Sequence, residues 1–237
     1  MRTLPTIAFL SILLLGLSSC RKDQCKDGDE YPRGAIRTLA PFTAINVNLS
    51  AIVELIQDTT HYVELVVEEN LETHLATRII NDTLDLSLGF CFNNHAEILI
   101  KVHFDSLNTI SIDGPGDIVS KSKLSQNDLT LNIRSSGDMD LTTDIKNLIT
   151  NINGTGIVTL NGQVHHHLIH HNGSGSVNTY QAMTDSVIVN LNNTGGVYVR
   201  VKNSLTATIS NSGNIYYKGR PTLTNNITGS GEVISEN

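Results

Sequence analysis

The sequence is poor in aromatic, charged and sulfur-containing residues. It contains no tryptophan and only three cysteines, and aromatic residues make up 5% of its 237 positions. Charged residues account for 16%, with 23 acidic side chains against 16 basic ones. An acidic chain does not attract the phosphate backbone, so nucleic acid is not expected as a partner.

The residues that are abundant favour strands and tight turns. Asparagine, serine, threonine and glycine are frequent, and the apolar positions are mostly isoleucine, valine and leucine. Such a composition is typical of an all-β protein, because β-branched residues suit strands and small polar residues suit turns. The length fits one large domain or two small ones.

The one long apolar run lies at the N-terminus, over residues 4–17. It is shorter than the roughly 20 residues that span a bilayer, and it follows a basic start, so residues 1–19 are interpreted as a signal peptide. The run ends in Leu17-Ser18-Ser19-Cys20, which matches a lipobox. Cys20 is therefore predicted to carry acyl chains that anchor the protein to a membrane. The alternative is a plain signal peptide with an incidental cysteine.

Residues 20–36 are predicted to form a flexible tether, because they are densely charged and show no period. The opening Arg21-Lys22-Asp23 is similar to the signal that follows the lipid cysteine in surface-exposed lipoproteins of Bacteroidetes. We therefore expect an outer membrane lipoprotein, with the cell surface favoured over the periplasmic face. In an exported protein Cys25 and Cys91 can form a disulfide, but their spacing leaves two unrelated thiols equally open.

A short glycine motif recurs between residues 108 and 237. It is three residues long, ends in glycine in all seven copies and has serine or threonine in the middle of six. Successive copies are 18–21 residues apart, and such a period is the signature of a solenoid or array. The last residues of the copies are Gly116, Gly137, Gly156, Gly175, Gly195, Gly213 and Gly231.

The positions around each motif alternate between apolar and polar. Four residues before the last glycine the chain has an isoleucine in most copies, and two residues after it an isoleucine, valine or methionine in all. The positions five and three residues before that glycine are polar and are mostly asparagine, serine and threonine. This period of two indicates strands with one face in the core. Each unit is therefore predicted to run as strand, corner and strand, and to stack at about 4.8 Å on the next unit.

The motif itself predicts a corner in the chain. Glycine and asparagine tolerate positive φ and serine bonds locally to the backbone, so left-handed conformations are expected there. The middle hydroxyls are expected to hydrogen-bond along the stack. An antiparallel meander or sandwich would also show short strands and turns, but it does not require one residue type at one offset in every copy. We therefore predict an all-β fold, a parallel β-helix (β-solenoid) with coils of about 18–21 residues.

Residues 37–106 are rich in strands but lack a clean period. Segment 45–55 fits the coil template with a degenerate corner at Leu49-Ser50-Ala51, and the residues between it and Gly116 leave room for about three more coils or an excursion. Strands are predicted over 61–67, 84–88, 96–103 and 107–112, and a helix over 70–78 with Asn70 as its cap. One domain is thus expected over 37–237, with an irregular N-terminal cap at 37–106 and regular coils at 107–237.

Together these features resemble the family called putative autotransporter adhesin "head GIN" domain, which is common in lipoproteins of Bacteroidetes. The resemblance rests on the opening around Phe42, Ile45 and Val47, on the glycine corners, and on Tyr217 to Pro221 followed by Gly231. It implies a parallel β-helical domain, and the family brings no catalytic residues with it. The chain departs from the pattern at Gly195-Gly196 and in the histidine-rich coil.

The histidines of that coil are the best candidates for a metal site. His165 and His167 could meet if the chain turns back between them, whereas His166 and His170 are expected to face outward and His171 inward. The alternative is a variable return loop with one buried neutral histidine, and it is favoured. We therefore expect no bound metal and no cofactor.

Exposed charges are too few for the polysaccharide-lyase chemistry of many β-helices, although Asp117, Asp138 and Asp140 could bind calcium weakly. We therefore expect a non-catalytic envelope protein, an adhesin or binding module for a carbohydrate or a protein. A lyase-type enzyme and a purely structural periplasmic component stay open as alternatives. A sugar-stacking patch is considered at Tyr180, Tyr198, Tyr216 and Tyr217, with Tyr217 expected in the core.

Overall fold

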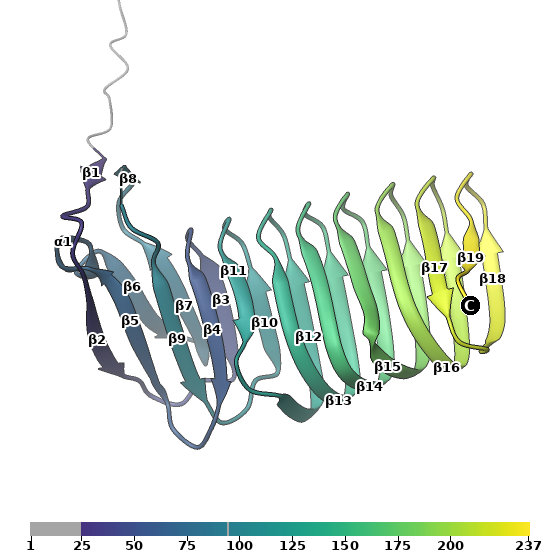
Figure 1. Cartoon of the computed structure of the whole chain (residues 1–237), viewed down its shortest axis with the longest axis horizontal. Coiled ribbons are helices and arrows are strands. Elements are labelled where there is room, and N and C mark those ends of the chain that lie inside the picture. The colour runs from purple at the N-terminus through teal and green to yellow at the C-terminus, as the bar shows by residue number, and fades with distance from the viewer. Residues whose placement is uncertain (1–24, 94) are drawn as a thin grey trace, which may run out of the picture.

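The computed structural model describes residues 25–93 and 95–237, and almost every regular element in them is a strand. The strands stack into one long solenoid that runs from the purple N-terminal end to the yellow C-terminal end (Figure 1). Successive regular coils pair in parallel along their whole length. The predicted parallel β-solenoid is therefore confirmed, and the antiparallel alternative is not found.

Each regular coil has one strand segment before its corner and one after the previous corner. From β13 to β16 these two segments join into one long strand that bends on its way from corner to corner. The strands of this part are β10 (Thr109–Ile112), β11 (Asp117–Ser120), β12 (Leu124–Ile133), β13 (Met139–Ile152), β14 (Ile157–His171), β15 (Ser176–Leu191), β16 (Gly196–Ile209), β17 (Asn214–Lys218), β18 (Thr222–Ile227) and β19 (Val233–Ser235).

The predicted inward columns stack in register and form the core, except in the last coil, where Ile227 is exposed. Four residues before the corner glycine, Ile112 pairs with Ile133, and the column continues through Ile152, His171, Leu191, Ile209 and Ile227. Two residues after it, the column runs through Ile118, Met139, Val158, Val177, Val197, Ile215 and Val233. Like residues therefore lie on like residues, and each coil needs only its two neighbours to bury its core.

The corner glycines are required by close packing between coils and not by backbone conformation. A Cβ atom on Gly156 would lie 2.0 Å from the carbonyl oxygen of Gly137, and one on Gly175 would lie 2.0 Å from that of Gly156. Among the described glycines, positive φ occurs only at Gly162 and Gly219, which lie outside the corners. The expectation of left-handed corners is therefore wrong. Stacking places one corner's carbonyl where the next corner's side chain would be.

Side-chain hydrogen bonding along the axis runs through asparagines and, in one corner, through the first-position hydroxyl of Ser135, which donates to the carbonyl oxygen of Gly114, rather than through the hydroxyls in the middle of the corners. The serine and threonine side chains in the middle of the corners are exposed and bond to no other described residue. Next to them, Asn172 donates to the side-chain oxygen of Asn153 at 3.2 Å, and Asn192 donates to that of Asn172 at 2.9 Å. The expected hydroxyl stack is thus replaced by an amide ladder one step away.

The cap at the N-terminal end is built by an excursion of the chain, not by further regular coils. β3 (Ala44–Asn48) and β4 (Ile52–Gln57) stack directly on β10 and β11, so the degenerate corner at residues 49–51 is a true first coil. The chain then leaves the stack and returns through 58–106. The cap strands are β1 (Lys26–Asp27), β2 (Pro32–Thr38), β5 (Tyr62–Glu68), β6 (Leu75–Ile80), β7 (Thr83–Leu88), β8 (Phe92–Asn93) and β9 (Leu99–Phe104).

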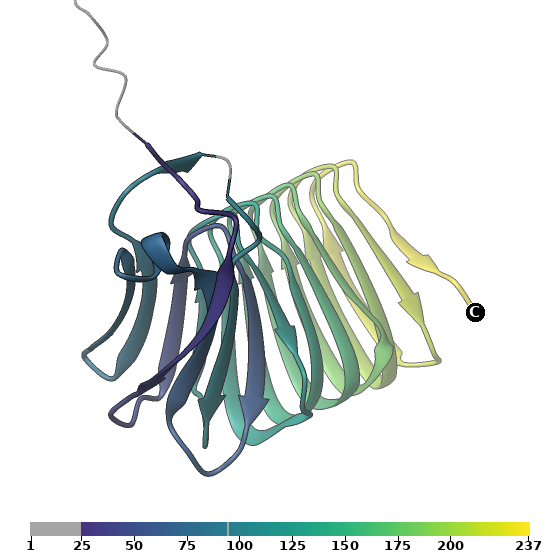
Figure 2. The same cartoon turned by 60° about the vertical axis from the view of Figure 1, so that its left-hand side comes forward.

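Pairing in the cap changes from parallel to antiparallel. β7 and β9 lie parallel to β3 and β4, but β6 pairs antiparallel with β7, and β5 pairs antiparallel with β9 and β2. Figure 2 shows these strands closing the end of the stack. The antiparallel strands end the repeat because they cannot continue the parallel register.

The predicted helix over 70–78 is largely wrong. Only α1 (Glu69–Glu72) is helical, and Leu75–Ile80 forms β6. The N-cap is Glu68, and the Asn70 side chain donates instead to the carbonyl oxygen of Asp27 at 2.8 Å. A helix of that length is marginal alone, whereas the strand buries Leu75 and pairs with β7 along its whole length.

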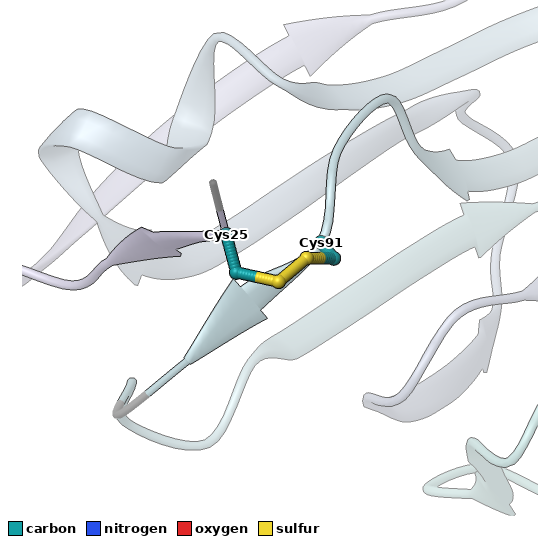
Figure 3. The surroundings of a disulfide bond; sticks show 2 residues. All are labelled: Cys25 and Cys91. Atoms are coloured by element: carbon teal, nitrogen blue, oxygen red, sulfur yellow. A yellow bond between two sulfur atoms is a disulfide. The ribbon is translucent and has the colours of Figure 1, made fainter. Parts of the chain in front are cut away.

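A disulfide joins Cys25 to Cys91, with their Cα atoms 4.7 Å apart (Figure 3). Beside it, β1 pairs with β8 in parallel. The segment 20–36 expected as a tether thus includes strand residues, because β2 begins at Pro32 and pairs with β5. Cys20 and the signal segment lie outside the described residues. No helix in the described part is long and apolar enough to cross a bilayer.

Candidate functional site

The tyrosines on the outer surface pack on one another. The rings of Tyr198 and Tyr216 are stacked with centroids 4.8 Å apart, and Tyr180 meets Tyr198 edge to face at 5.8 Å. The Lys218 ammonium lies 4.3 Å from the Tyr180 ring centroid. Tyr217 is half-buried against the core, as expected. Protein groups therefore already cover one ring face of Tyr198, of Tyr216 and of Tyr180.

The aspartates considered for calcium are engaged by the solenoid itself. Asp117 accepts a hydrogen bond from the backbone N–H of Asp138 at 2.9 Å, and Asp138 accepts one from that of Ile157 at 2.7 Å. Asp140 accepts a bond from the side chain of Asn161. These carboxylates satisfy polar groups of the next coil, and no group of three metal-ligating side chains is found in the described part of the chain.

The structure separates the two histidines proposed as metal ligands. His167 points into the core, where its Nε2 lies 2.9 Å from the hydroxyl of Thr150, and burial lowers its pKa to about 3. His165 lies on the outer side, and its Nδ1 is 2.7 Å from a carboxylate oxygen of Asp185. On a regular strand two residues this far apart would face the same side, but the bend at His165 interrupts the strand and turns its side chain outward, so the two histidines do not share one ion.

The other histidines of this coil lie as expected. His171 is buried in the inward column, and its Nε2 donates to the carbonyl oxygen of Gly175 at 3.0 Å. Burial lowers the pKa of His171, so it too is a neutral core histidine. His166 is exposed and His170 is half-buried on the outer face.

A polar groove lies where the long strands bend, on the side of the coil opposite the glycine corners. Its volume is about 540 Å³, and its lining comes from three successive coils: Ser125, Gln126, Asn127, Asp144, Lys146, His165 and His166. Asn127, Lys146, His165 and Asp185 occupy the same bend position in consecutive coils, between the paired positions of the two flanking strand segments. The bend turns their side chains outward, so one coil after another contributes to the groove.

The charges of this polar groove are unevenly satisfied. Asp144 forms an ion pair with Lys123, whose Nζ lies 3.2 Å from a carboxylate oxygen, and Asp185 is bonded to His165. Lys146 has no partner among the described residues, and neither has the side chain of Asn127. The groove therefore offers a free cation and free hydrogen-bonding groups, while the two carboxylates closest to them already have partners.

The described residues around His165 do not include the nucleophile of a covalent hydrolase. A carboxylate orients His165, but no serine, threonine or cysteine side chain in the described residues is hydrogen-bonded to it. A nucleophile within reach of such a base is the mark of covalent catalysis.

A family model covers most of this chain. The model described as "Putative auto-transporter adhesin, head GIN domain" matches residues 41–221. The chain belongs to the head GIN domain family. This confirms the resemblance seen in the sequence. No curated protein matches the chain.

Solved structures share the fold of this head GIN domain. A putative adhesin from Bacteroides fragilis is 20% identical and has a TM-score of 0.83, with 89% of this chain and 99% of that chain covered. A putative adhesin from Parabacteroides merdae is 20% identical with a TM-score of 0.75 over 89% and 98%. A putative lipid binding protein from Parabacteroides distasonis is 20% identical with a TM-score of 0.72 over 89% and 99%. At this identity the likeness establishes the fold alone.

The polar groove was missed by sequence reasoning, which followed the strands and corners but not the bends. Its residues lie about 19 positions apart along the chain, and only the repeat register brings them together. An alignment of the coils at the bend shows Lys146, His165 and Asp185 at one position, and that column of charges is the signal that could have located the site.

Proposed function

We propose that this protein is a non-catalytic binding module of the cell envelope that holds its ligand in the polar groove. The observation that carries the proposal is the free ammonium of Lys146, which lies beside free side chains of Asn127, Ser125 and His166 in one groove. A few converging polar groups on a rigid scaffold are typical of ligand sites. The adhesin names of the family and of its structural neighbours agree with a binding role.

The expected ligand is a carbohydrate, with a protein surface as the alternative. Amide, hydroxyl and imidazole groups at the spacing of successive coils can hydrogen-bond several hydroxyls of one sugar chain. A glycan array probed with the full mature chain tests this. We expect hits that weaken at least tenfold in Lys146→Asn, which restores the asparagine found at this position in the preceding coil. The control is Lys202→Asn, an exposed lysine outside the groove. An array without hits would rule out a carbohydrate as the ligand of the groove.

The proposed location is the outer membrane, with Cys20 as the lipidated residue and the solenoid on the cell surface. The support is the lipobox and the Arg21-Lys22-Asp23 that follows it. Protease shaving of intact cells should remove the wild-type protein from the membrane fraction. Cys20→Ala should release the protein from the membrane. Protection of the wild type from protease in intact cells would place it on the periplasmic face.

An enzymatic role of the lyase type can be tested directly. We expect no unsaturated product when the protein is incubated with pectin or alginate, because the candidate carboxylates bond to the next coil. An absorbance increase from unsaturated uronates that is lost in His165→Asn would instead make the groove an active site.

A further inference from the structure

One outward column changes its chemistry in two of the three coils that line the polar groove and in the coil that follows them. The column lies seven residues before each corner glycine, and it is formed by Thr109, Thr130, Ile149, Leu168, Ile188, Thr206 and Thr224. Ile149 and Ile188 point toward solvent from an otherwise polar sheet face, and they are 36% and 47% exposed. Three adjacent coils thus replace a threonine by a large apolar side chain that the core does not use. We call these three residues the apolar stripe.

The apolar stripe borders the polar groove. A hollow of about 240 Å³ lies along it, lined by Ile149, Leu168 and Ile188 together with polar neighbours that include His166. His166 also lines the polar groove, so the two hollows share a wall. One ligand can therefore reach both.

We propose that the ligand of this site is an anionic amphiphile, with its charged head in the polar groove and its apolar part on the apolar stripe. The inference rests on the part of the proposed function in which the groove holds a ligand, and it names an anionic amphiphile as that ligand in place of a carbohydrate without an apolar part. The head is anionic because Lys146 is free while Asp144 and Asp185 are paired with Lys123 and His165. The apolar part is required because burying exposed apolar area is the favourable step that the stripe offers.

The stripe limits the size of the apolar part. Three coils span two steps of about 4.8 Å, so the stripe is about 10 Å long. Beyond its ends the column returns to Thr130 and Thr206. Affinity should therefore rise with chain length and then level off once the stripe is covered.

Calorimetric titration of the full mature chain with small amphiphiles below their micelle concentrations tests the proposal. The probes are octyl phosphate, octyl glucoside and inorganic phosphate. We expect octyl phosphate to bind at least tenfold more tightly than either of the others, because only it carries both halves. In a series of alkyl phosphates each added methylene should improve affinity roughly two- to fourfold until the plateau.

Two variants separate the halves of the site. Ile149→Thr combined with Ile188→Thr should weaken octyl phosphate at least tenfold and leave inorganic phosphate unchanged, and these threonines match the neighbouring coils, so the fold is preserved. Lys146→Asn should weaken octyl phosphate and leave octyl glucoside unchanged. Thr224→Ile is the control for added apolar surface, because Thr206 separates this position from the stripe.

The outcomes distinguish this proposal from the proposed function. Glycan hits that depend on Lys146, together with no preference for octyl phosphate over inorganic phosphate, would overturn the amphiphile and keep the binding module. Octyl phosphate binding that is indifferent to the stripe variants would also overturn it. No binding of glycans or amphiphiles would overturn both.

Discussion

The regular coils of residues 107–237 and the cap of residues 25–106 are held together by different means. In the coils, each corner contacts the next through backbone atoms at distances that admit no side chain, and like residues stack in columns. In the cap, the segments have no sequence repeat, and individual side chains connect them to one another. Arg37 donates to the carbonyl oxygens of Leu75 and Glu72, and His103 bonds to Asp58. Repetition specifies the coils through the backbone, whereas the cap depends on individual side chains and a disulfide.

The largest expected effect comes from a methyl group at a corner. Gly156→Ala would place Cβ 2.0 Å from the carbonyl oxygen of Gly137 and 3.1 Å from a methyl group of the buried Ile133, so the coils would have to move apart to admit it. We expect a loss of about 4 kcal/mol or more in the free energy of unfolding by urea. The control is Gly34→Ala in the cap, where a Cβ meets nothing within 4 Å. Equal tolerance of the two substitutions would contradict the backbone account of the coils.

Removal of the disulfide should act on the cap alone. The bridge closes a loop of 66 residues, so Cys25→Ser with Cys91→Ser should lower the stability of the cap by about 2–4 kcal/mol. Hydrogen exchange should accelerate in β2 and β5 and stay unchanged in β14 and β15. Faster exchange throughout the coils would mean that the cap and the coils unfold as one unit.

Acid should weaken the histidine-rich coil first. Burial lowers the pKa of His167 to about 3 from the ordinary 6.5, so protons bind preferentially to the unfolded chain between these values. Stability is complete above pH 6.5 and is lost by up to about 1.4 kcal/mol per unit as the pH falls toward 3. His167→Leu, which matches Leu148 in the preceding coil, should flatten the slope between pH 6 and 4. His166→Asn, on the exposed face, should leave it unchanged.

The smallest expected effect lies in the cap at lower pH. Partial burial raises the pKa of Asp58, but hydrogen bonds from His103 and Thr60 outweigh it and lower the pKa to about 2. A carboxyl group with a lowered pKa stabilises above its ordinary 3.8 and loses this effect as the pH falls toward 2. Because Asp58 is partly exposed, Asp58→Asn should cost less than about 1 kcal/mol at pH 7. Thermal melts between pH 4 and 2 should show a shallower decline in this variant.

The sequence predicted the coils well because their information is local and repeated. The offsets of Ile112, His171 and Val177 from the corner glycine gave the correct inward columns, and even the degenerate corner at residues 49–51 lies directly beneath the first glycine corner. Ala51 has room for its Cβ because β7 and β9, which lie beneath β3 and β4, are connected by the long segment 89–98 and not by a tight corner. The cap was predicted less well, because the place where the chain leaves and rejoins the stack is set by tertiary pairing.

The errors have a common physical origin. The helix over 70–78 was inferred from local propensity, which pairing with β7 overrides. Positive φ at the corners was inferred from glycine alone, although glycine also serves where two backbones approach closely. The polar groove and the apolar stripe depend on columns at the bend and seven residues before the corner glycine. Those columns can be recognised only when the sequences of the coils are aligned over their whole length, and not only over the few residues on either side of the corner.

The disulfide also determines how the protein responds to mechanical load. A pull on the chain N-terminal to Cys25 would otherwise fall on β2, an edge strand with one neighbour, which can be peeled from β5 one hydrogen bond at a time. With the bridge in place, the load passes across Cys91 into β7 and toward β9. Both strands are paired on two sides, so they must be sheared rather than peeled. The covalent link therefore moves the point of loading from the weakest strand of the solenoid to its interior.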